Sequence, residues 1–179
     1  MTNSPKRALV RHIRLLVGAW LAAIIITIGL PVSAFAFTNS PHQLVAATNG
    51  QCLTFNTFLD NVYERLYTAQ CAQAWTPQLW DLDYVGDGYY NIRSHYDPTR
   101  CVDVLAYNQD QGARVVTWTC ISGATNQQWS LTYNSYTNAW KVRARHSGKC
   151  LQSSPPWVVQ GTYCTVVTWQ PYTEWYVTN

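Results

Sequence analysis

The sequence predicts an all-β domain with threefold internal symmetry, and three observations lead to this prediction. Cysteine and tryptophan residues recur at a nearly constant spacing along the chain. Short apolar and β-branched runs lie between them, bounded by turn-forming residues. No stretch after Ala36 keeps the apolar periodicity of an amphipathic helix for long. Self-similarity with a period of roughly 20 to 50 residues is typical of repeat architectures.

The spacing defines three copies. Cys52, Cys101 and Cys150 follow one another at intervals of 49 residues, and Cys71 and Cys120 are separated by the same interval. Trp80 and Trp129 are also 49 residues apart. The third copy is shorter, because Cys164 lies 44 residues after its counterpart and Trp175 lies 46 residues after its own. The chain therefore contains three related units.

Residues 1–36 are predicted to be a secretory signal peptide, and residues 37–179 the folded domain. Four basic residues precede an apolar run from Leu15 to Leu30, and the small-residue pattern Ala34-Phe35-Ala36 follows. The basic residues are Lys6, Arg7, Arg11 and Arg14. An uncleaved anchor is the alternative, because the stretch from Leu15 to Phe37 is nearly long enough to span a bilayer. We expect cleavage after Ala36 and a secreted, extracellular protein.

Removal of this segment changes the charge of the chain. It carries four of the twelve basic residues and none of the nine acidic ones, so the remaining 143 residues have eight basic and nine acidic residues and a net charge of −1. The basic character of the whole chain therefore gives no support for binding to nucleic acid, or for the mature form binding a membrane surface. About 143 residues suffice for one domain with a core and are too few for two.

The six cysteines all lie in the predicted mature part, which favours three disulfides over a metal site. No Cys-x-x-Cys sequence occurs, and the histidines do not stand at ligand spacing near the cysteines. Six cysteines allow 15 connectivities. The internal symmetry favours bridges within each copy, at separations of 19, 19 and 14 residues. The expected pairs are Cys52–Cys71, Cys101–Cys120 and Cys150–Cys164.

Strands and turns can be assigned along the chain. Residues 44–46, 115–118 and 140–143 are rich in apolar, β-branched or aromatic residues and are predicted to be strands. Asn49-Gly50, Gly86-Asp87-Gly88 and Ser147-Gly148 supply residues that tolerate the positive φ of tight turns.

The predicted mature chain resembles the ricin B-type lectins over residues 43–177. The family motif is a Gln-x-Trp that closes each repeat behind a cysteine pair; it appears as Gln78-Leu79-Trp80 and Gln127-Gln128-Trp129, and degenerates to Thr173-Glu174-Trp175. The resemblance implies a single β-trefoil of three pseudo-repeats, each with an intra-repeat disulfide. It also implies that the three motif tryptophans pack in a shared core.

A sugar site requires an aromatic plane for the C–H face of the ring, together with polar groups for adjacent hydroxyls. The resemblance places such a site in the second repeat. There Asp103 would accept hydrogen bonds from the sugar, Trp118 would stack on it, Asn126 would hydrogen-bond it and Gln127 would support Asp103. Each residue also has a structural alternative, because Asp103 and Asn126 could serve turns, Trp118 the core, and Gln127 the repeat motif alone.

The other two repeats lack these residue types. In the first, Thr54, Ala69 and Pro77 stand at the positions of the Asp, the aromatic and the Asn, and in the third Gln152, Thr162 and Tyr172 do so. We therefore expect one intact carbohydrate site. Val116 departs from the family pattern, because a polar side chain often lies at its position.

The resulting hypothesis is a lectin for galactose or N-acetylgalactosamine that binds glycans on glycoproteins or polysaccharides. It requires no cofactor and no metal, has no catalytic residues and leaves open an oligomer or a partner chain. Scattered acids, Asp81, Asp83, Asp87, Asp97 and Asp110, show no glycosidase or calcium-loop pattern. The alternative is a protein-interaction trefoil, such as a secreted inhibitor or a toxin-delivery subunit. Aromatic residues without a clear core position favour it: Tyr89, Tyr90, Tyr96, Trp157 and Trp169.

Overall fold

The computed structural model describes residues 37, 41–57, 64–165 and 170–178 of the chain. The predicted signal peptide and Trp169 lie outside these residues. The strands of the first repeat are β1 (Gln43–Ala46), β2 (Cys52–Thr54), β3 (Glu64–Arg65), β4 (Tyr67–Ala69) and β5 (Trp80–Gly86). The second repeat comprises β6 (Tyr89–Ser94), β7 (Arg100–Val104), β8 (Val115–Thr119) and β9 (Gln128–Asn134). The third comprises β10 (Ala139–Ala144), β11 (Cys150–Ser154), β12 (Trp157–Gly161) and β13 (Glu174–Thr178).

Six of the described strands close into a barrel. Antiparallel pairing links β1 to β13, β13 to β10, β10 to β9, β9 to β6 and β6 to β5. An isolated bridge between His42 and Trp80 joins the last strand to the segment before β1 and completes the circuit. Closure removes the exposed strand edges that would otherwise be open to pairing with another chain.

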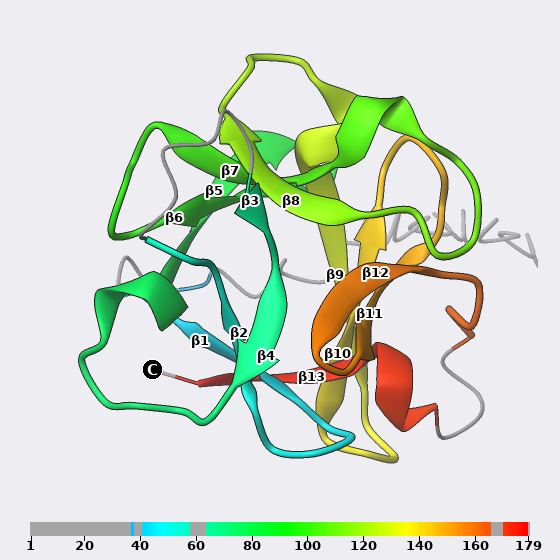
Figure 1. Cartoon of the computed structure of the whole chain (residues 1–179). Helices are drawn as coiled ribbons and strands as arrows, with labels where there is room; N and C mark the ends of the chain where they lie inside the picture. Colours follow the sequence, from blue (N-terminus) through cyan, green and yellow to red (C-terminus); the bar gives the residue numbers. More distant parts are fainter. Residues whose placement is uncertain (1–36, 38–40, 58–63, 166–169, 179) are drawn as a thin grey trace, which may run out of the picture. The chain divides into compact units, whose positions relative to one another are not determined.

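The remaining strands form hairpin-like pairs at one end of the barrel, visible near β7, β8 and β12 in Figure 1. Strand β2 pairs with β4, β7 with β8, and β11 with β12. Leu66 connects all three repeats here, because its N–H donates to Val115 O (3.0 Å) and its carbonyl accepts from Val158 N (3.0 Å). The observed barrel with three capping pairs confirms the predicted β-trefoil, and the three predicted strand segments fall on β1, β8 and β10.

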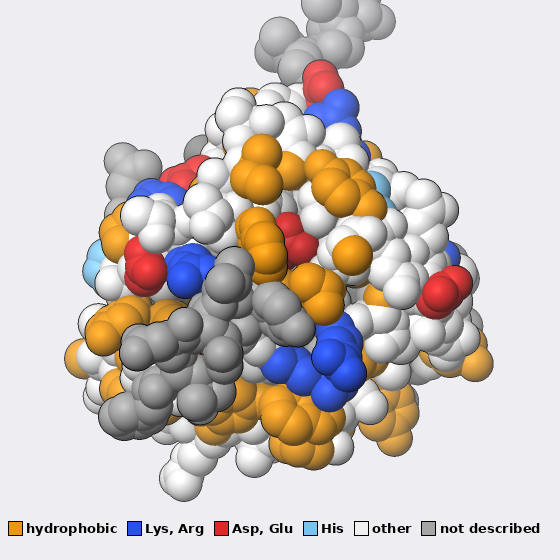
Figure 2. All heavy atoms as spheres, turned by 45° about the horizontal axis from the view of Figure 1, so that its top comes forward, with side chains coloured by type: hydrophobic (Ala, Val, Ile, Leu, Met, Phe, Trp, Pro, Cys, Tyr) orange, Lys and Arg blue, Asp and Glu red, His pale blue; other side chains and the backbone are white. Residues whose placement is uncertain are grey.

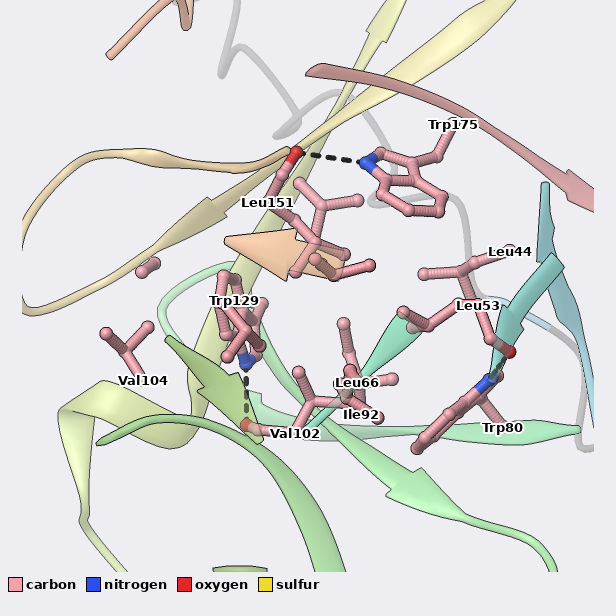
Figure 3. Packing of buried hydrophobic residues seen from close by; sticks show 14 of the residues in the cluster. Leu44, Leu53, Leu66, Trp80, Ile92, Val102, Val104, Trp129, Leu151 and Trp175 are labelled. Atoms are coloured by element: carbon pink, nitrogen blue, oxygen red, sulfur yellow. Dashed lines mark hydrogen bonds between the residues drawn. The ribbon is translucent and has the colours of Figure 1, made fainter. Parts of the chain in front are cut away.

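The motif tryptophans form the centre of the core. Trp80, Trp129 and Trp175 are fully buried. Each indole N–H donates to the backbone carbonyl of the residue that follows the first cysteine of its own repeat: Leu53 O at 3.1 Å, Val102 O at 3.0 Å and Leu151 O at 3.0 Å. Figure 3 shows these three bonds around the apolar side chains that share the core. Burial of a tryptophan is favourable only when its N–H finds such an acceptor.

Short 3-10 turns precede each motif tryptophan: η1 (Thr76–Gln78), η3 (Thr125–Gln127) and η4 (Pro171–Thr173). A fourth turn, η2 (Leu105–Tyr107), occurs in the second repeat after β7. Positive φ at Gly50 (67°) and Gly148 (68°) closes equivalent turns before β2 and β11. The predicted glycine turns are thereby confirmed.

The disulfides join Cys52 to Cys71, Cys101 to Cys120 and Cys150 to Cys164, as the symmetry predicted. The Cα–Cα distances of 5.0, 5.0 and 5.5 Å lie within the ordinary range for such bonds. No helix in the described ranges is long and apolar enough to cross a membrane.

The third repeat replaces the motif glutamine with a buried charged cluster. Lys141 Nζ lies 2.7 Å from Thr173 Oγ1, to which it donates, and 3.5 Å from Glu174 Oε1. Asn134 Nδ2 donates to the same carboxylate oxygen at 2.9 Å. Lys141 and Glu174 are both almost completely buried. Burial lowers the pKa of Lys141, and the charge of Glu174 acts in the opposite direction.

We predict that Lys141→Ala lowers the free energy of unfolding by about 3–5 kcal/mol, because it leaves the Glu174 carboxylate buried without its cation. The double variant Lys141→Met/Glu174→Gln should recover most of the loss, since no charge then remains. Urea denaturation of the oxidised protein measures both effects, with Lys149→Ala as a matched control that changes stability by less than about 0.5 kcal/mol. A loss below about 1 kcal/mol for Lys141→Ala would contradict a buried ion pair.

Candidate functional site

Asp103 lies in β7 with its side chain on the outer face of the strand. Its neighbours Val102 and Val104 point into the hydrophobic core, and strand alternation turns Asp103 the other way. It pairs with Val116 of β8, whose side chain shares the same face. Val116 is fully buried, so the departure noted in the sequence places an apolar side chain opposite Asp103 that does not line the surface.

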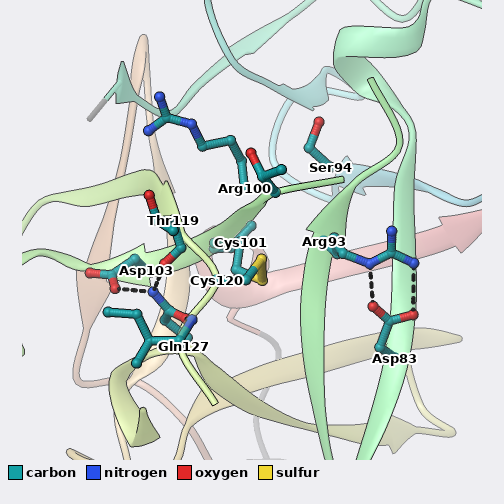
Figure 4. The surroundings of a disulfide bond; sticks show 12 residues. Asp83, Arg93, Ser94, Arg100, Cys101, Asp103, Thr119, Cys120 and Gln127 are labelled. Atoms are coloured by element: carbon teal, nitrogen blue, oxygen red, sulfur yellow. Dashed lines mark hydrogen bonds and ion pairs between the residues drawn. A yellow bond between two sulfur atoms is a disulfide. The ribbon is translucent and has the colours of Figure 1, made fainter. Parts of the chain in front are cut away.

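Two amide side chains clamp the Asp103 carboxylate. Asn126 Nδ2 and Gln127 Nε2 both donate to Asp103 Oδ2, each at 2.9 Å. The second of these bonds is drawn in Figure 4 beside the disulfide of this repeat. No described residue donates a hydrogen bond to Asp103 Oδ1, and Asn126 Oδ1 is buried without a partner among the described residues. The carboxylate therefore keeps one acceptor oxygen, Oδ1, that the described part of the protein does not use.

Gln127 also ties the surrounding backbone together. Its Nε2 donates to Thr119 O at 2.9 Å, and its Oε1 accepts from Ile121 N at 2.8 Å. Gln78 makes the same pattern in the first repeat, where it donates to Gln70 O and to Thr54 Oγ1. The supporting role of the motif glutamine is thus independent of an aspartate at the neighbouring position.

The carboxylate lies in the wall of a surface pocket of about 320 Å³. Its lining comprises Asp103, Leu105, Ala106, Tyr107, Trp118, Ile121 and Asn126. In Figure 2, which brings the end of the domain that carries β7 and β8 forward, an acidic side chain lies in a hollow between hydrophobic ones. Three of the four residues predicted from the sequence therefore line one concave surface, and Gln127 supports it from behind.

The disulfide between Cys101 and Cys120 positions two of these residues. Asp103 stands two residues after the first cysteine and Trp118 two residues before the second, and Cys101 and Trp118 are paired across β7 and β8. The crosslink therefore fixes the carboxylate and the indole relative to each other. Trp118 is half-buried and lines the pocket, so it does not belong to the shared core.

The turn η2 supplies residues that the sequence analysis did not assign to the site. Ala106 (φ 59°) and Tyr107 (φ 54°) both have left-handed backbone conformations, which are costly for residues other than glycine. Tyr107 is exposed, and its ring contacts His146 edge-on at 6.0 Å between centroids. The sequence does contain one signal for this part of the site: an aromatic residue, Tyr107, lies four positions after Asp103 and is followed by a polar loop.

Burial perturbs the titration of Asp103. Desolvation raises its pKa from 3.8 to about 6, and the hydrogen bonds from Gln127 and Asn126 act against this increase. Carboxylates with raised pKa values in clefts are enriched at functional sites.

These features agree with the comparison to known proteins. The sequence matches the family model of the ricin-type beta-trefoil lectin domain over residues 37–174. The chain belongs to this family. A search of curated proteins gave no match.

Solved structures carry the same fold as this ricin-type domain. The designed threefold-symmetric protein ThreeFoil is 26% identical, with a TM-score of 0.68 over 78% of this chain and 98% of its own. An exo-beta-1,3-galactanase from Clostridium thermocellum is 21% identical (TM-score 0.67), and the match covers 78% of this chain but only 30% of that enzyme. Polyporus squamosus lectin, bound to a human-type influenza-binding epitope, is 16% identical (TM-score 0.64), over 79% of this chain and half of the lectin.

The other two repeats of this ricin-type domain have no comparable arrangement at the corresponding positions. In the first, Thr54 is buried and bonded to Gln78, and Ala69 offers no aromatic plane. In the third, Thr173 replaces the motif glutamine and bonds to Lys141 and to Tyr163 O. The described residues contain no cluster of His, Cys, Asp and Glu side chains able to hold a metal ion.

We predict that Asp103→Asn raises the free energy of unfolding at pH 7 by about 2–3 kcal/mol, since a neutral side chain avoids the burial cost of the carboxylate. Because the pKa of Asp103 is raised in the folded protein, the folded state binds a proton at this carboxylate more tightly than the unfolded chain does. Wild-type stability should therefore fall as pH rises from about 4 to about 6 and stay level above that. Urea midpoints at pH 4 and pH 7 measure the effect, and the gap between the two proteins should close at pH 4.

The exposed Asp110→Asn serves as the control, because it removes one carboxylate without relieving a burial cost. Equal stability of wild type and Asp103→Asn at pH 7 would contradict the raised pKa.

Proposed function

We propose that the mature chain is a secreted carbohydrate-binding lectin with one sugar site, in the second repeat, for galactose or N-acetylgalactosamine. Secretion rests on the predicted signal peptide at residues 1–36. Glycans on glycoproteins or polysaccharides would be its partners. The family membership supports carbohydrate binding, and the arrangement around Asp103 supports the location.

One observation carries the proposal: Asp103 and Asn126 line the pocket, and neither Oδ1 of Asp103 nor the buried Oδ1 of Asn126 accepts a hydrogen bond from a described residue. A buried acceptor without a partner is costly, so this arrangement suits a ligand that supplies hydrogen-bond donors. Hydroxyls on adjacent carbons of a sugar ring are donors of this kind. The two amides hold the carboxylate in place before the ligand arrives, which reduces the entropy lost on binding.

Aromatic side chains supply the second requirement of a sugar site. Trp118 and Tyr107 both line the pocket, and an indole plane can pack against the C–H face of a sugar ring. Leu105 and Ile121 extend the apolar lining. The combination of an apolar wall with few convergent polar groups is typical of small-ligand sites.

The proposed activity is binding without catalysis. Hydrolysis of a glycosidic bond in most glycosidases requires two carboxylates that flank it. Among the described lining residues of the pocket, Asp103 is the one carboxylate.

A protein-interaction role is the second candidate, and one observation favours it. Ring contacts run from Tyr84 through Tyr90, Phe37 and Trp140 to Tyr133, with centroid separations of 5.1 to 5.6 Å. Tyr84 and Tyr133 are exposed. Exposed aromatic clusters are enriched at protein interfaces. This cluster belongs to the β5–β6 and β9–β10 hairpins and the residue that starts the domain, and none of its members lines the pocket.

We predict saturable binding of lactose and N-acetylgalactosamine to the mature, oxidised protein with a Kd of about 1 mM, the scale expected of a single shallow site. Asp103→Ala and Trp118→Ala should each weaken binding at least tenfold, because the first removes the acceptor and the second the stacking surface. Isothermal titration calorimetry and tryptophan fluorescence provide the measurements.

The matched controls are Asp87→Ala and Trp75→Ala, which alter an exposed acid and an exposed tryptophan that line neither the pocket nor the hollow beside it. If the folded wild-type protein bound neither sugar, the assignment of galactose as the ligand would be contradicted. A blank result on a broad glycan array would then favour the protein-interaction role.

We further predict that affinity for lactose falls about tenfold between pH 7.5 and pH 5, because the ionised carboxylate accepts the sugar hydroxyls and its pKa is about 6. Calorimetric titrations across this range give the profile. The residual binding of Asp103→Asn should not change with pH over the same interval. A flat profile for wild type would show that binding does not depend on ionisation of Asp103.

A further inference from the structure

Arg65 lies on the same face of the sheet as the proposed sugar site. Asp103 of β7 pairs with Val116 of β8, and Val116 pairs in turn with Arg65 of β3. Residues that face each other across antiparallel strands project to the same side. Two inter-strand spacings place the Cα atoms of Asp103 and Arg65 about 10 Å apart. The register thus puts a cation two strands away from the carboxylate, on the outer surface.

The Arg65 guanidinium is held in place by an aromatic ring. Its Cζ lies 4.4 Å from the centroid of the Trp157 ring. Its Nε is buried and has no hydrogen-bond partner among the described residues. Burial lowers the pKa of Arg65, and the charge of nearby Arg114 lowers it further. An arginine oriented by stacking and lacking a full set of acceptors is suited to bind an anion.

Arg114 connects this cation to the sugar pocket. It lines a second hollow of about 430 Å³, together with residues of the loop after η2. The two hollows share Leu105 and Ala106 as a common wall, so they are neighbours on the surface. In Figure 2 a group of basic side chains lies on the face that also shows the acidic side chain in its hollow. Neither arginine forms an ion pair with a carboxylate of the described ranges.

We propose that the glycan recognised at this face carries an anionic group, a sulfate ester or a carboxylate, which Arg65 and Arg114 bind while Asp103 holds the galactose unit. This proposal rests on the proposed function of the pocket and adds the chemical class of its ligand. A planar guanidinium pairs with either anion through parallel N–H donors, so both sources share one recognition chemistry.

Nearby acids set the size of the expected effect. Asp110 also lines the second hollow and carries the opposite charge. Glu64 precedes Arg65 in β3, and strand alternation directs its side chain to the other face. The lining of the second hollow therefore has one cation, Arg114, against one exposed carboxylate, and Arg65 lies near enough to Arg114 to be affected by its charge. Exposed ion pairs of this kind are weak and sensitive to salt, so an affinity gain of about threefold is expected.

The test compares lactose with lactose sulfated at the 3′ or 6′ position and with lactose sialylated at the same positions, using calorimetry on the mature oxidised protein at low salt. At least one charged form should bind about threefold more tightly than lactose, and the gain should shrink at 0.5 M salt, where the Debye length is roughly half its value at physiological ionic strength. The sulfated and sialylated arms identify which source of the anion fits.

Variants assign the gain to the two arginines. Arg65→Gln and Arg114→Gln should each lower the affinity for the charged glycan to that for lactose, and Arg65→Lys should retain part of it, which separates charge from folding. Asp110→Asn should increase the gain. Arg145→Gln is the matched control, because Arg145 also lies over an aromatic ring, Tyr89 at 4.5 Å, but is already paired with Asp87 and with Gln128.

The two proposals fail differently. Binding of lactose with no preference for any charged form would overturn the anionic ligand and leave the lectin function intact. Binding of no galactoside, neutral or charged, would overturn both. A preference for charged forms that survives both arginine substitutions would also overturn the assignment to these residues.

Discussion

The structure depends on a hydrogen bond that occurs once in each repeat, from the indole N–H of the motif tryptophan to the carbonyl of the residue that follows the first cysteine. A tryptophan can be fully buried at the centre of the domain only because this acceptor is present. The bond also fixes the distance between the last strand of a repeat and its capping pair. Every outward-facing residue of that pair, Asp103 included, is positioned by this inward contact.

The site is a local modification of a structural element that each repeat needs. In the first repeat, Gln78 already links two loops and bonds to Thr54. The second repeat keeps the same glutamine contacts and exchanges the threonine for Asp103, so the carboxylate enters a place where a donor already exists. The cost is a carboxylate whose charged form is disfavoured by burial. A desolvation cost of this kind is consistent with a carboxylate kept for binding rather than for stability.

The fold could be predicted from the sequence because its cysteine and tryptophan residues recur at a regular interval. The 49-residue interval, the cysteine pairs and the motif tryptophans were sufficient to predict a threefold all-β domain and all three disulfides, and the resemblance to the ricin B-type lectins implied the β-trefoil. Asp103, Trp118, Asn126 and Gln127 were predicted by family position, and the structure brings them together, although their role in binding a sugar stays a prediction. Ala106 and Tyr107 were not assigned to the site, because the left-handed backbone that turns them toward it has no signature in residue type, and the position of Tyr107 after Asp103 was the one signal. Arg65 was missed for another reason: its closeness to Asp103 depends on pairing between different repeats.

The full set of site residues occurs in one repeat, and this affects how the protein would behave on a glycan-bearing surface. Thr54 and Ala69 in the first repeat, and Gln152 and Thr162 in the third, leave those lobes without the carboxylate and the aromatic plane. A monomer with one pocket is univalent: it can coat a glycan-bearing surface but cannot crosslink two of them. Agglutination of cells would therefore report self-association of this chain rather than its affinity for sugar.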